Sequence, residues 1–313
     1  MKKGQGAQFN WIFILVAGII VMGFFSVFIF KYIELENKKA SFRIVRNFNE
    51  NLNLLETSSV FGGDLIKLGI VTKIDFTCAG DDSLITVNNE KELTLNLGDK
   101  IVFAPNSVRD KNLGGWVYEW NYPFLVTKFL YLTSSKFKYI IVGNNEEVNK
   151  IPEVFNIEKV SSVSEIKDPS NTKVIFFSEQ NNAEELINRY SGLEVIYIDA
   201  TNKKVKFYNS NEEFDYFGEA FLYGAIFSGN SDNYKCAMNS ALKRLSLISR
   251  IYSGKIYLLN LVEGSECRSL SGLMDGGLNA YKNYIGEGSL DSIMTGLKEQ
   301  NLELHGRGCT AVF

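Results

Sequence analysis

Two residue types that often carry catalytic chemistry are scarce in this chain: it has one histidine, His305, and four cysteines. A Ser–His–Asp or Cys–His catalytic arrangement would have to use His305. Cys309 follows it by four residues, but Gly306 and Gly308 lie between them and favour a loop over a shared helix face. We therefore expect Cys309 to be a disulfide or an ordinary thiol rather than a nucleophile. A single histidine also excludes most multi-histidine metal sites.

The sequence contains none of the short motifs that hold common cofactors or catalytic metals. It has no phosphate-binding G-x-x-x-x-G-K-[ST], no strand followed by G-x-G-x-x-G, and no H-E-x-x-H. We therefore predict no catalytic residue, no cofactor and no metal, and favour a protein that is not an enzyme.

The four cysteines all follow a long apolar segment near the N-terminus: Cys78, Cys236, Cys267 and Cys309. Their number is even, and no two have the C-x-x-C spacing of zinc sites or redox pairs. We favour two disulfides in an exported domain. Four buried thiols remain the alternative.

The segment between the two cysteine-bearing helical patterns suggests how the cysteines pair in disulfides. Cys236 and Cys267 each begin an amphipathic helix, and KIYLLNLV at 255–262 has the composition of a strand. At about 3.3 Å per residue, a strand of about 8 residues would retrace the roughly 27 Å of the first helix. Cys236 would then pair with Cys267, and Cys78 would pair with Cys309 by elimination.

The apolar segment at 9–30 contains no charged residue. At about 1.5 Å per residue its length suffices to cross a hydrocarbon core of about 30 Å. A cleavable secretion signal has a shorter apolar region, of about 7–15 residues, and a small-residue cleavage site. We therefore predict a retained transmembrane helix, with the lipid bilayer as its partner and the remaining chain on one side.

Two observations disagree about which side that is. By the positive-inside rule, the side of the span with more basic residues lies in the cytoplasm. Two basic residues, Lys2 and Lys3, precede the span, and five follow it, which would place the domain in the cytoplasm. The five are Lys31, Lys38, Lys39, Arg43 and Arg46. The cysteines favour an oxidising compartment. We expect an extracytoplasmic domain.

The residues Lys2, Lys3, Gly4 and Gln5, followed by the apolar segment, resemble the class III signal peptides of archaeal type IV pilin-like proteins. The resemblance covers about thirty residues. It implies cleavage between Gly4 and Gln5 on the cytoplasmic side, with the helix retained as an anchor or filament core. The chain departs from such pilins in two ways: Phe9 stands where they usually carry Glu, and its soluble part is larger than their small β-rich heads. These departures favour a simple membrane anchor over a subunit that polymerises.

The soluble part begins with a pattern typical of an amphipathic helix and continues with extended segments. Val45, Phe48, Leu52 and Leu55 form an apolar stripe, which either packs on the domain that follows or forms a short coiled-coil stalk. The extended region after it contains an aromatic group that we interpret as core, with a sugar or partner surface as the alternative; the group is Trp116, Trp120, Tyr122, Pro123 and Phe124.

Three apolar segments, KYIIVG, TKVIFFSE and LEVIYIDA, alternate with helix-like segments. That alternation predicts a parallel sheet with right-handed crossovers. Ligands of such sheets bind at the carboxyl ends of the strands. The candidate ligand edge is Gly143, Asn144, Ser178, Glu179 and Asp199.

The predicted fold class is mixed α/β. Glycines that interrupt the C-terminal helices are expected where helices pack closely; they are Gly218, Gly224, Gly272, Gly276 and Gly277. The expected regions are a basic leader at 1–8, the transmembrane helix at 9–30, a juxtamembrane helix at 31–57, a β-rich region at 58–135, a parallel α/β unit at 136–211, and a mainly helical region at 212–313 packed on the sheet.

A net charge of −3 with dispersed basic residues argues against nucleic acid as a partner. We expect a single-span membrane-anchored protein with an extracytoplasmic ectodomain, a non-enzymatic component of a cell-surface or pilin-like assembly. Its partners would be the bilayer and further copies of itself or other anchored subunits. The alternative is an anchored enzyme or small-ligand receptor that uses the carboxyl edge of the parallel strands.

Overall fold

The computed structural model describes residues 5–57, 63–143, 145–166, 171–177, 180–190, 193–284 and 290–313. The chain divides into two compact units, Met1–Asn47 and Phe48–Phe313. The first is helical and the second holds both sheets and the remaining helices.

The helix α1 runs from Gln5 to Thr57. Within the described residues it is the one helix that is long and apolar enough to cross a membrane, with a mean hydropathy of 2.9 in its most apolar window. Ser26 donates its hydroxyl to the carbonyl of Met22 at 2.9 Å, so this polar group is satisfied within the helix. The first unit therefore has the length and composition of a signal or anchor helix.

The last turns of α1 belong to the second unit and supply its core with Phe48, Leu52 and Leu55. Leu55 lies over strand residue Gly115, where an added Cβ would come within 2.8 Å of its Cδ1 atom. Glu56 forms an ion pair with Lys100 at 2.5 Å. The apolar stripe thus packs on the following domain at these three positions.

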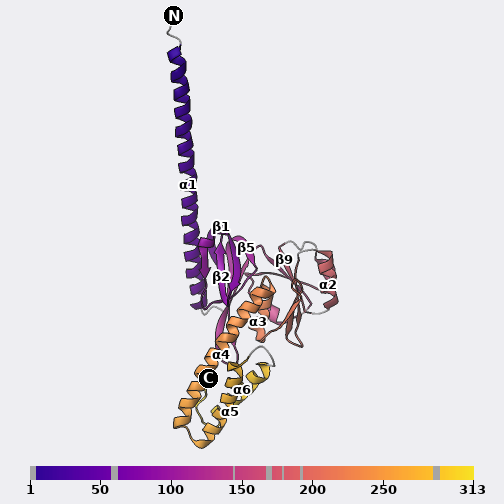
Figure 1. The fold of residues 1–313 in the computed structure, drawn as a ribbon. Helices are drawn as coiled ribbons and strands as arrows, with labels where there is room; N and C mark the ends of the chain where they lie inside the picture. Colours follow the sequence, from indigo (N-terminus) through magenta and orange to yellow (C-terminus); the bar gives the residue numbers. More distant parts are fainter. Residues whose placement is uncertain are drawn as a thin grey trace. The chain divides into compact units, whose positions relative to one another are not determined.

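The first sheet has the strand order β3-β2-β1-β5-β6-β4 (Figure 1). All its pairings are antiparallel except that of β4 with β6. Its strands are β1 (Asp64–Ala79), β2 (Asp82–Val87), β3 (Thr94–Asn96), β4 (Ile101–Phe103), β5 (Ser107–Asn121) and β6 (Leu125–Ser134).

The second sheet has the order β12-β11-β10-β9-β7-β8 and is parallel from β8 to β10. Its strands are β7 (Lys138–Val142), β8 (Asn156–Val160), β9 (Thr172–Phe176), β10 (Glu194–Asp199), β11 (Lys204–Phe207) and β12 (Glu212–Asp215). The three predicted parallel strands are confirmed. β8 was not predicted. The helix that the sequence indicated before it is also wrong in extent, since a 3-10 turn, η2 (Glu147–Lys150), forms there.

Helices cover both faces of the second sheet. α2 (Gln180–Arg189) packs on one face through Ala183 and Leu186. α3 (Gly218–Phe227) lies between the two sheets (Figure 1) and is buried from Ala220 to Phe227. Tyr131 of the first sheet donates to the carbonyl of Ala220 at 2.7 Å. A helix that is apolar on all sides is expected only where protein surrounds it.

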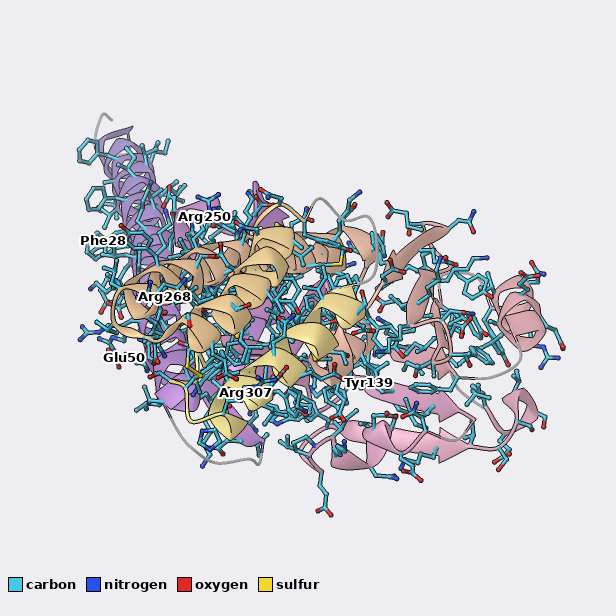
Figure 2. All side chains as sticks on the ribbon, turned by 90° about the horizontal axis from the view of Figure 1, so that it is seen from below. Phe28, Glu50, Tyr139, Arg250, Arg268 and Arg307 are labelled. Atoms are coloured by element: carbon cyan, nitrogen blue, oxygen red, sulfur yellow. A yellow bond between two sulfur atoms is a disulfide. The ribbon has the colours of Figure 1, made fainter. Side chains whose placement is uncertain are left out.

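Three further helices form the C-terminal arm: α4 (Ser231–Val262), α5 (Ser265–Lys282) and α6 (Leu290–Gly306). α4 contacts β4 and β6 of the first sheet as well as α5, and α5 contacts α6. Figure 2 shows the arm from below. The strand predicted at 255–262 is wrong, because this segment is the last part of α4.

The predicted close helix contact is found at Gly277, whereas at Gly224 the close neighbour is a residue of strand β4. Gly224 leaves room for the ring of Phe103 and Gly277 for the side chain of Leu297, since a Cβ would meet those atoms at 2.7 and 2.8 Å. The prediction of close packing is wrong for Gly272 and Gly276, where a Cβ would meet nothing within 4 Å. Gly218 also has open space; it begins α3 with a φ of +76°, a conformation that favours glycine.

Candidate functional site

All four cysteines form disulfides, but the predicted pairing is wrong. Cys78 is bonded to Cys236 and Cys267 to Cys309, with Cα–Cα distances of 6.3 and 5.7 Å, in the usual range. The error follows from the misassigned strand at 255–262. α4 has 32 residues and is about 48 Å long, so it carries the chain away from Cys236 instead of returning to it.

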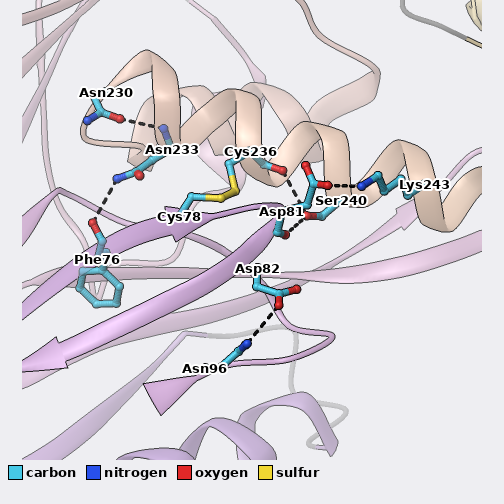
Figure 3. The surroundings of a disulfide bond; sticks show 10 residues. All are labelled: Phe76, Cys78, Asp81, Asp82, Asn96, Asn230, Asn233, Cys236, Ser240 and Lys243. Carbon is cyan, nitrogen blue, oxygen red and sulfur yellow. Dashed lines mark hydrogen bonds and ion pairs between the residues drawn. A yellow bond between two sulfur atoms is a disulfide. The ribbon is translucent and has the colours of Figure 1, made fainter. Parts of the chain in front are cut away.

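The Cys78–Cys236 disulfide joins the end of β1 to the first turns of α4 (Figure 3). Polar contacts surround it on both sides: Asn233 donates its amide to the carbonyl of Phe76 at 3.3 Å. Asp81 accepts hydrogen bonds from Ser240 and Lys243. This junction fixes the base of the arm to the first sheet.

The Cys267–Cys309 disulfide closes the arm itself. α6 ends in a Schellman turn, in which the backbone N–H of Cys309 reaches the carbonyl of Leu304 at 3.0 Å. Thr310 then donates its hydroxyl to Glu263 at 2.6 Å, beside the start of α5. The C-terminal residues are thereby tied back to the α4–α5 connection.

Cysteine-based catalysis with His305 is excluded, because Cys309 is oxidised and His305 lies exposed in the last turn of α6. The aromatic group is core, as the favoured interpretation expected: Trp116, Trp120, Tyr122 and Phe124 are each no more than 4 % exposed. The described residues contain no group of three or more His, Cys, Asp or Glu side chains arranged to hold a metal.

Two residues of the predicted ligand edge can be placed. Gly143 follows β7 and Asp199 ends β10, and the register of β7, β9 and β10 sets both at the carboxyl edge of the parallel strands. Asn144, Ser178 and Glu179 lie outside the described residues.

The carboxylate of Asp199 is already occupied. It accepts the backbone N–H of Asn202 at 2.9 Å, the side-chain amide of Asn202 at 2.7 Å and the backbone N–H of Thr201 at 3.0 Å. The hydrogen bonds from Asn202 hold the pKa of Asp199 below its ordinary value, and only weak desolvation opposes them. Asp199 therefore shapes the β10–β11 turn and is not a free acceptor.

A cleft of about 450 Å³ adjoins that turn. Asp291, from the first turn of α6, accepts hydrogen bonds from Tyr122 and Lys203 across it. Burial, followed by the hydrogen bond to Asp291, raises the pKa of Tyr122 far above its ordinary value. The cleft is lined by Thr201, Asn202, Lys203, Asp215, Tyr216, Phe217, Leu290 and Asp291.

Sequence reasoning did not single out Lys203 or Asp291. They are 88 residues apart, and neither belongs to a motif. Lys203 is ion-paired to Asp291, and Asp291 also accepts a hydrogen bond from Tyr122, so these polar groups already have partners within the protein. The cleft presents no activated nucleophile among the described residues.

Lys173 is a buried charged residue elsewhere in the core and was also not predicted. Lys173 of β9 is 1 % exposed and donates to the carbonyls of Ala225, at 2.8 Å, and Ser228, at the end of α3. Burial lowers the pKa of Lys173 to about 8, although the charge of Glu194 on β10 acts in the opposite direction. The cation at a helix C-terminus is favourable for the macrodipole. Lys173 therefore has a structural function.

Comparison with known proteins finds no matching family, no matching curated protein and no matching solved structure. The chain is thus defined by its own features. It has a long apolar N-terminal helix followed by a mixed α/β domain that two disulfides cross-link.

Proposed function

We propose that this chain is a single-span membrane protein whose α/β domain lies outside the cytoplasm and takes part in a cell-surface assembly. One observation carries the proposal: a helix with the length and composition of a membrane span is joined to a domain in which every cysteine is in a disulfide. The helix and the disulfides are independent indications of where the domain lies.

The helix supports retention in a bilayer. From Trp11 to Phe30 its large apolar side chains are exposed, Trp11 by 75 % and Phe30 by 72 %. In water such a surface is unfavourable, whereas in hydrocarbon it requires no protein partner. Trp11 and Tyr32 lie near the two ends of the span, where interfacial aromatic residues are common.

The disulfides support an oxidising compartment. They close loops of 158 and 42 residues that do not overlap along the chain. In the chain-entropy account, loops of these lengths stabilise the fold by about 5 and about 4 kcal/mol. A cytosolic thiol pool would remove that contribution, so the domain is best suited to the extracytoplasmic side.

The N-terminal resemblance supports one route to this topology. Cleavage between Gly4 and Gln5 would leave a mature chain that begins with the apolar helix. Phe9 in place of an acidic residue favours an anchor over a filament core, since a charge in lipid is costly and usually functional. Edman sequencing or intact mass of the mature protein tests this part: a first residue of Gln5 supports prepilin-type processing, and an intact Met1 or Lys2 removes the pilin-like proposal.

A non-enzymatic function agrees with the chemistry of the described residues. The sole histidine is exposed, the cysteines are oxidised, and Lys203 and Asp291 of the cleft are paired with each other. Binding surfaces, rather than a reactive centre, are what the ectodomain offers.

A small-ligand receptor is the second candidate, favoured by the cleft beside the β10–β11 turn. Saturation-transfer NMR on the full chain in micelles, with mixed amino acids and monosaccharides as probes, tests it. Binding that is lost in Asp291→Asn would support the receptor. Signals equal in wild type and variant would reject the cleft as the binding site.

A further inference from the structure

The second half of α4 carries an apolar stripe that faces solvent. Leu247, Ile251, Leu258 and Leu261 are 58 %, 63 %, 62 % and 63 % exposed, and Gly254 lies in the middle of the stripe. Successive positions are separated by four, three, four and three residues. This is the 3.5-residue period of a helix-pairing seam.

The stripe is additional to the surface that folds α4 onto its own domain. Leu245, Ser249 and Ile256 on the opposite face are buried. Tyr257 and Val262, at 67 % and 81 % exposed, flank the stripe. Scattered exposed apolar residues are ordinary, but a continuous stripe on a helix that is already packed marks an interaction surface.

The spacing is nearly symmetric about Gly254. Leu247 and Leu261 lie seven residues before and after it, and Ile251 and Leu258 lie three before and four after. A Cβ at Gly254 would meet nothing within 4 Å, so a second helix can approach closely there. We propose that this stripe pairs with the same stripe of a second copy of the chain, antiparallel, with the two-fold axis at Gly254.

The charges distinguish this arrangement from a parallel one. Between Asn233 and Val262, α4 contains no acidic residue, so in a parallel pair Arg250 would lie beside position 255 of the other copy and meet no acidic partner. In the antiparallel arrangement Arg250 faces Tyr257 of the second copy, which offers its ring to the cation. Figure 2 labels Arg250 on α4.

The remaining basic residue is directed away from the seam. Lys255 donates to the carbonyls of Ala311 and Val312 at 3.2 and 2.7 Å, so its ammonium group is held at the chain's own C-terminus. Arg250 has no ion pair or hydrogen bond among the described residues. It is therefore free to contact a partner.

The apolar stripe has a small area, so we expect the dimer to be weak. At on the order of 100 Å² for each of six exposed side chains, the stripe buries about 600 Å² per copy, below the roughly 800 Å² per partner of a standard interface. Anchoring both copies in one bilayer raises their local concentration and offsets this deficit. In that respect the inference rests on the proposed function, which it deepens by naming the partner.

The test uses the full chain in detergent micelles, with the photo-crosslinker p-benzoylphenylalanine in place of Tyr257. We expect a dimer band that survives reduction and whose tryptic map joins fragment 256–268 of one copy to fragment 245–250 or 251–255 of the other. A cross-link between two 256–268 fragments would indicate parallel pairing and overturn the proposed arrangement. Cross-linking to detergent or lipid alone would assign the stripe to a membrane surface and overturn it as well.

A matched pair of variants completes the test. Leu258→Asp should weaken dimerisation at least tenfold in native mass spectrometry, whereas Leu302→Asp, at an equally exposed position of α6, should leave it unchanged. Both residues are exposed, so both variants should keep the fold and the two disulfides, which circular dichroism and intact mass verify. A wild-type monomer at all concentrations, or equal effects of the two variants, would reject the contact. A monomer that still requires detergent for extraction from the membrane and still contains both disulfides would reject the dimer but not the proposed function.

Discussion

Cys78, at the end of β1, is bonded to Cys236, in the second turn of α4, across 158 residues of sequence. Asn233 contacts Phe76 of β1, and Ser240 and Lys243 contact Asp81 in the β1–β2 turn. Arg244 of α4 also donates to Thr127 of β6. The base of the arm is therefore held to the first sheet by a covalent bond together with polar contacts.

The connectivity of the disulfides is directly measurable. Non-reducing peptide mapping of the full chain should yield one linked pair containing Cys78 and Cys236 and another containing Cys267 and Cys309. Linked fragments that join Cys236 to Cys267 would contradict the fold of α4 as one long helix. Four alkylatable thiols in native protein would contradict the oxidised state altogether.

Removing the long-range disulfide should cost more stability than removing the short-range one. The double variant Cys78→Ser/Cys236→Ser should lose about 5 kcal/mol and Cys267→Ser/Cys309→Ser about 4 kcal/mol, because the closed loops differ in length. Urea unfolding in micelles, monitored by tryptophan fluorescence, measures both. Reductant should lower the midpoint of the wild type and leave the variant lacking both disulfides unchanged.

Gly115 should not tolerate a side chain. Its Cβ would lie 2.8 Å from Leu55 and 3.2 Å from Ile66, so Gly115→Ala should destabilise the domain by about 1–3 kcal/mol. Gly114→Ala is the matched control on the same strand, since its nearest neighbour would be 3.4 Å away. Leu55→Ala should offset part of the cost in the double variant. Equal losses for Gly114→Ala and Gly115→Ala would contradict the packing of α1 on this strand.

Lys173 should give stability an unusual dependence on pH. Its pKa is about 8 in the fold and about 10.4 when unfolded, so between these values the unfolded chain binds more protons. The contribution of Lys173 to the unfolding free energy should therefore rise with pH across this window, by up to about 1.4 kcal/mol per unit.

The measurement for Lys173 is a difference between variants, because tyrosines titrate in a neighbouring range. Unfolding free energy of wild type minus that of Lys173→Met should increase from pH 8 to pH 10. Lys67→Met, which removes an exposed lysine from a strand, is the control variant. A difference for Lys173→Met that does not change with pH would contradict the lowered pKa of Lys173.

Elements with a strong local pattern were predictable. The segments KYIIVG, TKVIFFSE and LEVIYIDA are β-rich and apolar throughout, as strands buried on both faces are, and they form β7, β9 and β10. The helix of the first unit was predictable from the length of its apolar segment alone. β8, with the sequence NIEKV, is a short edge strand with exposed polar side chains, and its pattern does not distinguish it from a loop.

The segment 255–262 was wrongly predicted as a strand because it contains part of the exposed apolar stripe of α4. KIYLLNLV is nearly all apolar because α4 carries a buried face and an exposed apolar face at the same level, so its composition matches that of a buried strand. The disulfide pairing failed for the same reason. The cleft could not be predicted because Tyr122, Lys203 and Asp291 come from distant parts of the chain and meet only in the folded domain.

The central claim is that a membrane-anchored domain lies outside the cytoplasm, and protease accessibility tests it most directly. Trypsin added to intact cells should digest the domain after Thr57 and leave the membrane span protected, with no further cleavage of the domain when the cells are lysed. A domain that stays intact on whole cells and is digested only after lysis would place it in the cytoplasm and contradict the account.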